Sequence, residues 1–346
     1  MSNRPTLRWG IIGSGGIAKV FAAGLAASRH GRLAALASRD PSRPDLAVNF
    51  PDVPVLKGYD TLLRDPDIDA VYIALPHTAH AEWAIKAALA GKHALVEKPL
   101  AVATAEAEAV FEAHRSAGTF AGEAFMYRLH PQTKILGELI TSGTIGEVRM
   151  IQSSFGFQMP RYMPEHRLFA AKLAGGGILD TGGYPVSMAR FVAGAAIGRP
   201  FADPVRVIGS ARLNSEGTDN WAAAILTFEN GIIAQVACAP LARLDNVLRI
   251  HGSDGRLEVP DFWFAGGTRD HSPGRIDIVR ADGRPEAVRF EQMRHLFSYE
   301  ADAVAEAVWA QRLQFTSPGM DWADSLGNAR VLDKWRADAG IASVPN

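Results

Sequence analysis

The sequence has a single cysteine, Cys238, among its 346 residues. One cysteine cannot form an intramolecular disulfide, and it cannot supply the cysteine cluster of a structural zinc site. Long hydrophobic runs are also lacking, since no stretch approaches the roughly 18 apolar residues of a membrane span and the chain starts without an apolar signal core. We therefore expect a cytoplasmic protein in a reducing compartment, with no membrane partner.

An excess of charge of one sign is missing as well. The sequence has 36 Lys and Arg against 37 Asp and Glu, which gives a formal net charge of -1. Proteins that bind nucleic acid through its phosphates usually carry a basic excess, so we expect no nucleic-acid partner. The composition, 47% hydrophobic and 21% charged, is typical of a globular protein, and the length allows about two domains. A small molecule is the expected partner.

The first part of the sequence alternates between short apolar runs and helical patterns. The apolar runs have the length of strands, and they lack polar alternation, as parallel strands do when both faces of their sheet are covered. The helical segment 80–92 has an apolar face followed by Gly91, a residue that commonly ends helices. We predict a doubly wound α/β domain, the Rossmann type, over residues 1–122, with strands at 7–12, 33–38, 70–75 and 93–97.

The pattern changes after about residue 122. A helical segment at 131–143 is followed by long apolar stretches, and three of the connections between them carry Asn-Gly or Asp-Gly, at 230–231, 254–255 and 282–283. Such pairs between apolar stretches are the strongest short-range signal for a β-hairpin. We predict a second domain of α+β class over residues 123–319, built on an open, mainly antiparallel sheet. A last helical segment follows at about 320–340.

The first predicted strand runs into a glycine-rich turn. Gly13, Gly15 and Ala18 fit the dinucleotide fingerprint G-x-G-x-x-[GA]. The first glycine permits the tight turn, the second lets the backbone approach a pyrophosphate, and the small third residue lets helix and strand pack closely. A helix that starts at Gly16 and Ile17 presents free main-chain amides to the phosphates. The motif alone is common, and its place after the first strand of an alternating domain is what favours dinucleotide binding.

The end of the second predicted strand favours NADP over NAD. NAD-selective proteins carry an Asp or Glu about 20 residues after the fingerprint, where it binds the ribose hydroxyls. This sequence has Ser38 there, followed by Arg39. A serine can donate a hydrogen bond to a 2′-phosphate, and an arginine can neutralise its charge. The alternative is that Arg39 is a solvated loop residue and that Asp40 is the ribose-binding acid, displaced by two positions.

The fourth predicted strand ends on Glu97, Lys98 and Pro99, which is unusual for an interior strand. An unpaired buried ammonium is unfavourable, and a proline removes a backbone donor. The residues alone allow a buried salt bridge of Glu97, a strand end that reaches solvent, or a functional site.

Asp180 and Tyr184 follow three consecutive glycines in the second half of the sequence. If a helix begins near Leu179, these two side chains lie one turn apart on the same face. Such a pair can hold adjacent hydroxyl groups of a polyol. The alternatives are that Asp180 caps the helix and that Tyr184 is a core aromatic residue with a hydrogen-bonded hydroxyl.

Other polar residues are weaker candidates. His77 and His80 are three residues apart, but no third ligand with zinc-like spacing is evident, and we predict no metal site. The stretch 123–130 either contributes to a site or is a connection with a structural Arg–Glu pair. The stretch 155–169 is irregular, aromatic and basic, which suits a segment that closes over a substrate. The candidates in these two stretches are Glu123, Tyr127, Arg128 and His130, and then Arg161, Tyr162 and above all Arg167.

Four segments together resemble the Gfo/Idh/MocA oxidoreductases, and they look most similar to the branch of dimeric dihydrodiol dehydrogenases and NADP-linked D-xylose dehydrogenases. The segments are GIIGSGGIA (10–18), the stretch from AVYIALPHTAH to GKHALVEKPL (70–100), EAFMYRLHP (123–131) and GGGILDTGGYPVSMARF (175–191). The resemblance implies an N-terminal Rossmann domain and a C-terminal open β-sheet domain whose exposed face forms a homodimer or homotetramer. It also implies that the helix at 320–340 packs back on the first domain.

The resemblance implies roles for individual residues. Lys98 would donate to the oxygen of the carbon that exchanges hydride, Tyr184 would share the proton, and Asp180 would orient the hydroxyl. The family often has histidine where this chain has Tyr184, whereas the branch named above has tyrosine. A cis Lys98–Pro99 peptide bond is a further expectation. The cofactor-binding residues expected are Gly13, Gly15, Gly16, Ile17, Ser38, Arg39, Leu75, Pro76, His80, Glu97 and Arg167.

We therefore expect an NADP-dependent oxidoreductase that transfers hydride between nicotinamide and a hydroxyl-bearing carbon of a sugar, polyol or cyclic diol. A metal is not required, because a lysine can stabilise the developing alkoxide. One alternative is a redox-neutral enzyme of the same superfamily that keeps its nicotinamide cofactor tightly bound while it cleaves or epimerises a sugar. Another is a non-catalytic NADP-binding regulator, which the intact set of Lys98, Asp180 and Tyr184 disfavours.

Overall fold

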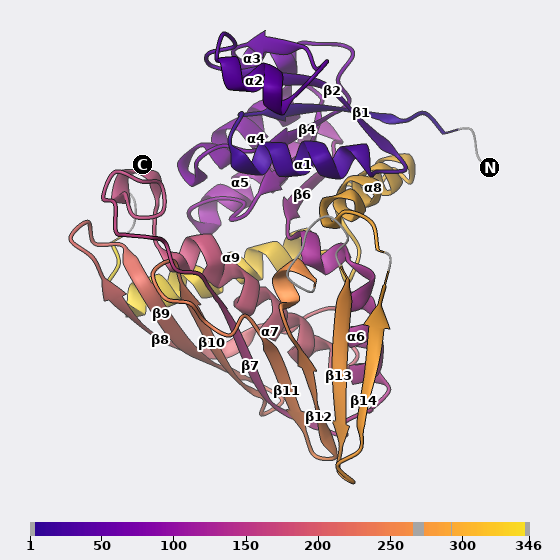
Figure 1. The fold of residues 1–346 in the computed structure, drawn as a ribbon, viewed down its shortest axis with the longest axis vertical. Coiled ribbons are helices and arrows are strands. Elements are labelled where there is room, and N and C mark those ends of the chain that lie inside the picture. Colours follow the sequence, from indigo (N-terminus) through magenta and orange to yellow (C-terminus); the bar gives the residue numbers. More distant parts are fainter. Residues whose placement is uncertain (1–3, 266–272, 292, 343–346) are drawn as a thin grey trace.

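Two β-sheets form the core of the protein, whose computed structural model describes residues 4–265, 273–291 and 293–342 (Figure 1). The first sheet is parallel throughout and has the strand order β3-β2-β1-β4-β5-β6. This is the order of a doubly wound nucleotide-binding fold, in which the strand order reverses between β1 and β4, so the predicted Rossmann architecture is confirmed. Its strands are β1 Leu7–Ile12, β2 Gly31–Ser38, β3 Val55–Lys57, β4 Ala70–Ile73, β5 His93–Glu97 and β6 Ala121–Ala124.

Helices cover both faces of the first sheet, which explains why its strands are apolar without alternation. Phe21 of α1 belongs to the buried cluster on one face, and Ala84 of α4 and Val110 of α5 belong to the cluster on the other. The helix α8, which follows the second sheet in the chain, packs against α1. These helices are α1 Gly16–Ala26, α2 Pro44–Asn49, α3 Tyr59–Leu63, α4 His80–Leu89, α5 Thr104–Ala117 and α8 Leu296–Trp309.

The second sheet has the order β14-β13-β12-β11-β7-β10-β9-β8 and is antiparallel except for the parallel pair β7 and β10. The three hairpins predicted from Asn-Gly and Asp-Gly are confirmed, as is the open, mainly antiparallel second sheet. Its strands are β7 Val148–Gly156, β8 Pro204–Leu213, β9 Asp219–Phe228, β10 Ile233–Ala239, β11 Leu248–Gly252, β12 Gly255–Val259, β13 Gly274–Arg280 and β14 Pro285–Phe290.

One face of this sheet is covered by helices, and the last of them, α9, also lies against the first domain (Figure 1). They are α6 Pro131–Thr141, α7 Gly183–Ala195 and α9 Trp322–Asp338, and the short helical turns of the chain are η1 His77–Ala79, η2 Met126–Leu129, η3 Ala171–Leu173, the π-helical η4 Ile178–Gly182 and η5 Phe262–Phe264. Within the described residues, no helix is both long and apolar enough to cross a bilayer.

The terminal helix α9 contacts both domains. Trp322 at its start stacks on Phe111 of α5, with ring centroids 5.1 Å apart, and Asp333 accepts a hydrogen bond of 3.0 Å from the main-chain nitrogen of Thr104. On its other side it packs on α7 and β8. The first domain is thus held to the second by a helix that comes last in the chain.

A buried charge cluster joins α9 to η2 and α7. Asp324 receives a hydrogen bond of 2.8 Å from Arg128 Nη2 and one of 2.5 Å from Arg190 Nη1. The alternative of a structural Arg–Glu pair within residues 123–130 is therefore wrong in its partner, because Arg128 is paired with a residue of the terminal helix. Glu123 instead accepts a hydrogen bond of 2.9 Å from the main-chain nitrogen of Leu100, and burial raises its pKa to about 7.

Candidate functional site

A cavity of about 860 Å³ lies between the two domains, at the carboxyl ends of β1, β2, β4 and β5. This volume is in the range of small-ligand and cofactor sites, and in open α/β sheets ligands bind at this edge. Every residue that the sequence predicts as catalytic or cofactor-binding lines it: Gly13, Gly15, Gly16, Ile17, Ser38, Arg39, Leu75, Pro76, His80, Glu97, Lys98, Arg167, Asp180 and Tyr184.

The glycine-rich turn between β1 and α1 fits a dinucleotide phosphate. Gly13 has a φ of +101°, and a Cβ there would lie 2.5 Å from the main-chain oxygen of Ala74, so the turn requires glycine. A Cβ at Gly15 or Gly16 would meet no protein atom within 4 Å, and because both line the cavity, it would occupy cavity space instead. The first turn of α1 has no side-chain cap and no acidic residue, so its main-chain amides remain for an anion.

The end of β2 forms the outer end of the cavity. Ser38 is buried, and its hydroxyl donates a hydrogen bond of 3.0 Å to the main-chain oxygen of Asp40. The Asp40 carboxylate accepts from the main-chain nitrogen and hydroxyl of Ser42, at 3.0 and 2.5 Å, and these two bonds lower its pKa. Asp40 is thus engaged within its own turn. Arg39 is exposed here.

A second arginine, Arg43, lies at this end of the cavity and was not predicted from the sequence. Its Nη1 donates a hydrogen bond of 3.2 Å to the hydroxyl of Ser14 in the glycine-rich turn, and its Nη2 pairs with Asp45 at 2.7 Å. Arg39 and Arg43 therefore place two guanidinium groups beside the same part of the cavity. Arg43 precedes α2 by one residue, and the path of this loop does not follow from any motif.

Glu97 and Lys98 end β5 in different surroundings. Glu97 is buried, and its carboxylate accepts hydrogen bonds from the hydroxyl of Tyr72 on β4 and from the main-chain nitrogen of Lys98. Burial raises the pKa of Glu97, whereas Lys98 and Tyr72 oppose that rise. The Lys98–Pro99 peptide bond is cis, as expected. The strand thus ends on a hydrogen-bonded acid and an amine that reaches the cavity.

Lys98 contacts the second domain at two residues. Its Nζ donates a hydrogen bond of 2.5 Å to the main-chain oxygen of Asp180 and lies 3.5 Å from the carboxylate Oδ1 of the same residue. It also lies 5.2 Å from the centroid of the Tyr184 ring, within the range of a cation–π contact. The structure therefore brings together the three residues predicted to be catalytic.

Asp180 lies within the π-helical turn η4, where its main-chain nitrogen donates to the oxygen of Gly176 at 3.1 Å, and so it is not an N-cap. Its Oδ1 accepts a hydrogen bond of 3.1 Å from Arg167 Nη1 and lies 3.9 Å from His77 Nε2. Burial alone would raise the pKa of Asp180, but the charges of Lys98 and Arg167 outweigh it and hold this pKa below its usual range. The carboxylate is therefore charged and serves two cations.

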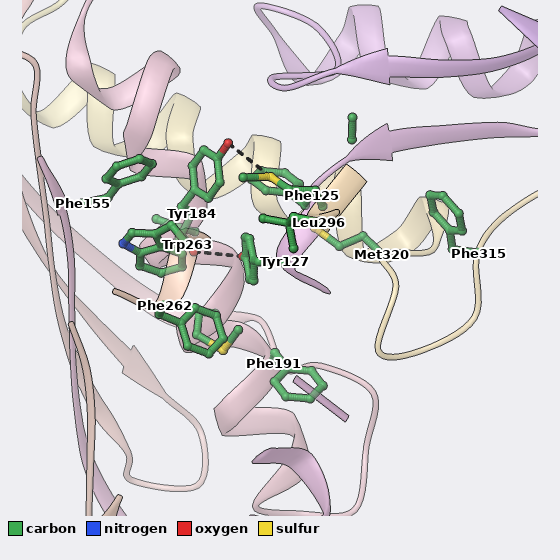
Figure 2. Packing of buried hydrophobic residues seen from close by; sticks show 14 of the residues in the cluster. Phe125, Tyr127, Phe155, Tyr184, Phe191, Phe262, Trp263, Leu296, Phe315 and Met320 are labelled. Atoms are coloured by element: carbon green, nitrogen blue, oxygen red, sulfur yellow. Dashed lines mark hydrogen bonds between the residues drawn. The ribbon is translucent and has the colours of Figure 1, made fainter. Parts of the chain in front are cut away.

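The ring of Tyr184 belongs to an aromatic cluster, and its hydroxyl is directed away from Trp263 (Figure 2). The ring makes edge contacts with Phe155 and Phe125, at centroid distances of 4.9 and 5.2 Å, and its hydroxyl lies 3.8 Å from the Met126 sulfur. The side chain is thus fixed by core packing and also lines the cavity. Tyr184 is therefore both a core aromatic residue and a residue of the site.

The two histidines of the loop after β4 differ in what they contact. His80, predicted to bind cofactor, has Nδ1 2.7 Å from the Pro99 oxygen and Nε2 2.9 Å from the Leu75 oxygen, so its ring holds the two adjoining loops in place. His77 has Nδ1 3.1 Å from the Ala174 oxygen and turns Nε2 toward Asp180. Among the described residues, no group of three or more His, Cys, Asp or Glu is placed to hold a metal ion.

The remaining candidates of the sequence lie elsewhere. The lining of the cavity does not include Glu123, Tyr127, Arg128, His130, Arg161 and Tyr162. Tyr127, for example, is buried and hydrogen-bonded to the main-chain oxygen of Tyr184 and to Ser187. The sequence did not predict an apolar wall of the cavity, formed where η2 begins, where β7 ends and where η5 lies, and it did not predict His77 as a lining residue. The wall consists of Met126, Phe155, Phe157 and Phe264.

Known proteins are similar to this chain over most of its length. D-xylose 1-dehydrogenase (NADP(+)) 2 of Haloferax volcanii is 33% identical over 331 residues, which cover 94% of this chain and 95% of that protein. Trans-1,2-dihydrobenzene-1,2-diol dehydrogenase of Mus musculus is 31% identical over 74% of this chain and 75% of its own. The structure of KijD10, a 3-ketoreductase from Actinomadura kijaniata in complex with TDP-benzene and NADP, superposes with a TM-score of 0.81 at 29% identity and covers 96% of this chain and 98% of that chain.

Family models match both parts of the chain. Residues 7–125 match the oxidoreductase family with an NAD-binding Rossmann fold, and residues 134–258 match the GFO/IDH/MocA C-terminal domain. The resemblance read from the four sequence segments, including its branch, is confirmed by these matches and by the relatives. The chain therefore belongs to the GFO/IDH/MocA family of oxidoreductases.

Proposed function

We propose that the protein is an NADP-dependent dehydrogenase or reductase that exchanges hydride with a hydroxyl-bearing carbon of a sugar, polyol or cyclic diol. The observation that carries the proposal is the meeting of Lys98, Asp180 and Tyr184 in the cavity that the glycine-rich turn opens into. The names of the relatives support the substrate class, since they act on D-xylose and on a cyclic diol.

Lys98 and Tyr184 handle the proton in this proposal. The bound nicotinamide supplies the carbon that accepts or returns the hydride. The Lys98 ammonium has three donors, one of which is directed at the Asp180 oxygen, and another binds the oxygen of the reacting carbon and stabilises its negative charge. In reduction Lys98, assisted by the Tyr184 hydroxyl, gives this oxygen a proton, and in oxidation the neutral amine removes it. Asp180 keeps the amine in place.

The other end of the cavity selects the cofactor. The amides of the first turn of α1 bind the pyrophosphate. Arg39 and Arg43 bind the 2′-phosphate, and Ser38 fixes the turn that carries them. The carboxylate of Asp40 is already bonded to Ser42, which supports NADP over NAD, because a ribose-binding acid must accept from the two ribose hydroxyls instead.

The test is a substrate panel with both cofactors. Aldoses, inositols, anhydrosugars and trans-diols are assayed with NADP and with NAD by absorbance at the nicotinamide band. We expect oxidation of at least one member with a clear preference for NADP, by enzyme from which all cofactor has been removed by gel filtration. A strong NAD preference would contradict the roles of Arg39 and Arg43. Cofactor that survives purification, without net NADPH formation, would favour the redox-neutral alternative.

We also propose that the outer face of the second sheet binds a second copy of the chain. Across β8 and β9 this face carries large exposed apolar side chains, and Ile208 lies opposite Ile225 in the register. Trp221 lies on the same face of β9 and is 47% exposed. Exposed apolar surface of this kind marks an interaction site, and most homo-oligomers are symmetric. Light scattering should give a dimer or tetramer that Ile225→Asp dissociates, and a monomeric native protein would overturn the proposal.

A further inference from the structure

His77 is held in one orientation by the second domain. It lies at the start of η1 and is 6% exposed, and its Nδ1 is 3.1 Å from the main-chain oxygen of Ala174. A carbonyl oxygen can only accept a hydrogen bond, so Nδ1 must carry a proton. The state of the other nitrogen, Nε2, then decides the charge of the ring.

Nε2 faces the cavity as an acceptor. It lies 3.9 Å from Asp180 Oδ1, which is longer than a hydrogen bond, so no proton is shared between these atoms. Burial lowers the pKa of His77 to about 3, although Asp180 opposes this. The Asp180 carboxylate is already paired with the positive charges of Lys98 and Arg167, so its charge is balanced without an imidazolium at His77. The ring is therefore neutral, and its Nε2 is an unprotonated acceptor near Asp180, in a residue that lines the cavity together with Lys98.

We propose that His77 is a specificity-determining residue, whose Nε2 accepts a hydrogen bond from a second hydroxyl of the substrate, next to the hydroxyl that Lys98 and Tyr184 process. The inference rests on the proposed function and narrows its substrate class to compounds with vicinal hydroxyl groups. The positions of the groups support it: Asp180 Oδ1 is 3.5 Å from Lys98 Nζ and 3.9 Å from His77 Nε2, and all three residues line the cavity. A donor and an acceptor thus lie near the same carboxylate, as recognition of two neighbouring hydroxyl groups requires.

A neutral, buried acceptor discriminates between substrates because it loses a hydrogen bond when the substrate lacks the matching donor. A substrate without the second hydroxyl leaves the Nε2 lone pair without a donor, and an unsatisfied buried group of this kind lowers binding by about 10- to 100-fold. The competing role for His77 is structural, because its bond to Ala174 also ties the loop after β4 to the segment that leads into η4. A purely structural residue affects all substrates alike.

The experiment compares pairs of substrates in two variants. Native enzyme, His77→Phe and His77→Gln are assayed with D-xylose and its 2-deoxy analogue, D-glucose and its 2-deoxy analogue, and trans-1,2-cyclohexanediol and cyclohexanol. For a diol that the native enzyme oxidises, we expect kcat/KM to exceed that of its partner by about 10- to 100-fold. His77→Phe should abolish this ratio by lowering kcat/KM for the diol alone. His77→Gln keeps an acceptor and should retain part of the ratio.

Each outcome either supports or contradicts the proposed role of His77. An equal loss for both members of a pair, or an unchanged ratio, would overturn the role of His77 while leaving the proposed function intact. If His77→Phe does not fold, as judged by thermal unfolding and NADPH fluorescence, His77→Gln is read by the same ratio. A native enzyme that oxidises none of these compounds would overturn this inference, and one that also oxidises none of the inositols and anhydrosugars of the substrate panel would overturn the proposed function.

A spectroscopic measurement tests the tautomer without turnover. In protein labelled with 15N-histidine, the His77 signals are assigned by their absence from His77→Phe. We expect an Nδ1–H ring with an unprotonated Nε2 from pH 6 to pH 8, and a shift of the Nε2 signal when the diol is added to NADPH-loaded enzyme. An imidazolium signal at pH 7, or no shift at a saturating diol concentration, would contradict the inference.

Discussion

Lys98 Nζ and the main-chain oxygen of Asp180 are 2.5 Å apart, although Lys98 follows a strand of the first sheet and Asp180 lies in a helical turn packed on the second. The position of the amine therefore depends on how the two domains pack. A hydrogen bond to a main-chain oxygen is also retained when the Asp180 side chain changes. Lys98 is thus positioned by the fold of η4 and by the packing of the two domains.

The substitution Lys98→Met should abolish turnover and spare cofactor binding. Methionine keeps most of the volume but has no donor for the substrate oxygen, and a positioned proton donor contributes about 100- to 10,000-fold in rate. We expect kcat to fall by at least about 100-fold, while the dissociation constant for NADPH, measured by fluorescence, stays within about threefold. Lys86→Met is the matched control, because Lys86 is an exposed residue paired with Glu82 on α4. Turnover that survives Lys98→Met would refute the assignment.

Arg43→Ala should weaken NADPH binding and leave NADH binding unchanged. A hydrogen bond between charged groups contributes about 1.5–3 kcal/mol, so the dissociation constant for NADPH should rise by about 10-fold or more. The constant for NADH, which lacks the 2′-phosphate, should stay the same, and isothermal titration measures both. Arg64→Ala, an exposed arginine at the end of α3 and outside the cavity lining, is the control. If both cofactors weaken equally, Arg43 supports the loop and does not read the phosphate.

Gly176→Ala should damage the approach to Asp180. Gly176 has a φ of +112°, and a Cβ there would lie 2.3 Å from Oδ1 of Asp219. The other oxygen of Asp219 accepts a hydrogen bond of 2.9 Å from the nitrogen of Ile178, the first residue of η4, so movement of this carboxylate shifts the turn that carries Asp180. We expect a lower Tm together with a lower kcat.

The control for this change is Gly217→Ala, which has a positive φ of +78° but no atom within 4 Å of its Cβ. It should show the backbone penalty alone, about 1–2 kcal/mol, with kcat unchanged. The prediction fails if the two alanine variants lose the same stability and the same activity, because the clash with Asp219 would then have no effect.

Local patterns were sufficient for most of the fold. The strands of the first sheet that are covered on both faces are continuous apolar runs, and the hairpins of the second sheet have Asn-Gly or Asp-Gly turns, so both could be predicted. Two strands of the first sheet were not: β3 has three residues, and β6 has the sequence AGEA, whose glycine and glutamate disfavour a strand. They pair because their neighbours offer hydrogen bonds, which is a tertiary effect.

The same distinction applies to the site. Gly13 and Lys98 could be found because a turn or a strand end determines their place. Arg43 and His77 could not, because their roles depend on contacts with Ser14 and Ala174 that no local pattern encodes. The partner of Arg128 was mistaken for the same reason, since Asp324 is 196 residues away in sequence.

Asp324→Ala should strongly destabilise the protein. The side chains of Arg128 and Arg190 are almost fully buried, and both donate to the Asp324 carboxylate. Removing the acid leaves the buried guanidinium of Arg128 without its counterion and leaves Arg190 with the exposed Asp203 alone. Breaking a buried pair in this way lowers the free energy of unfolding by about 3–5 kcal/mol. Asp67→Ala removes an exposed partner of Arg8 and should change it by at most about 1 kcal/mol. Urea denaturation compares the two, and a similar small effect for both would be inconsistent with the buried cluster.

Glu300→Gln should stabilise the protein increasingly as pH rises. Glu300 of α8 is buried, and within the described residues neither of its carboxylate oxygens has a hydrogen-bond partner. Burial, together with the nearby charge of Glu97, raises its pKa well above the ordinary value. A carboxyl group whose pKa is raised on folding stabilises the protein fully below its unfolded pKa, about 4.3, and loses that contribution as pH rises toward the folded pKa. Glutamine keeps the shape and does not ionise.

The Tm of Glu300→Gln relative to the native protein should therefore increase between pH 5 and pH 8, by an amount on the order of a few degrees. Glu82→Gln is the control, because Glu82 is an exposed helical acid paired with Lys86 and should show no such trend. Scanning calorimetry at four pH values across this range measures the difference. A difference in Tm that is the same at every pH would contradict this prediction. It would mean that the ionised Glu300 carboxylate gains a hydrogen-bond partner, so that its pKa is not raised on folding.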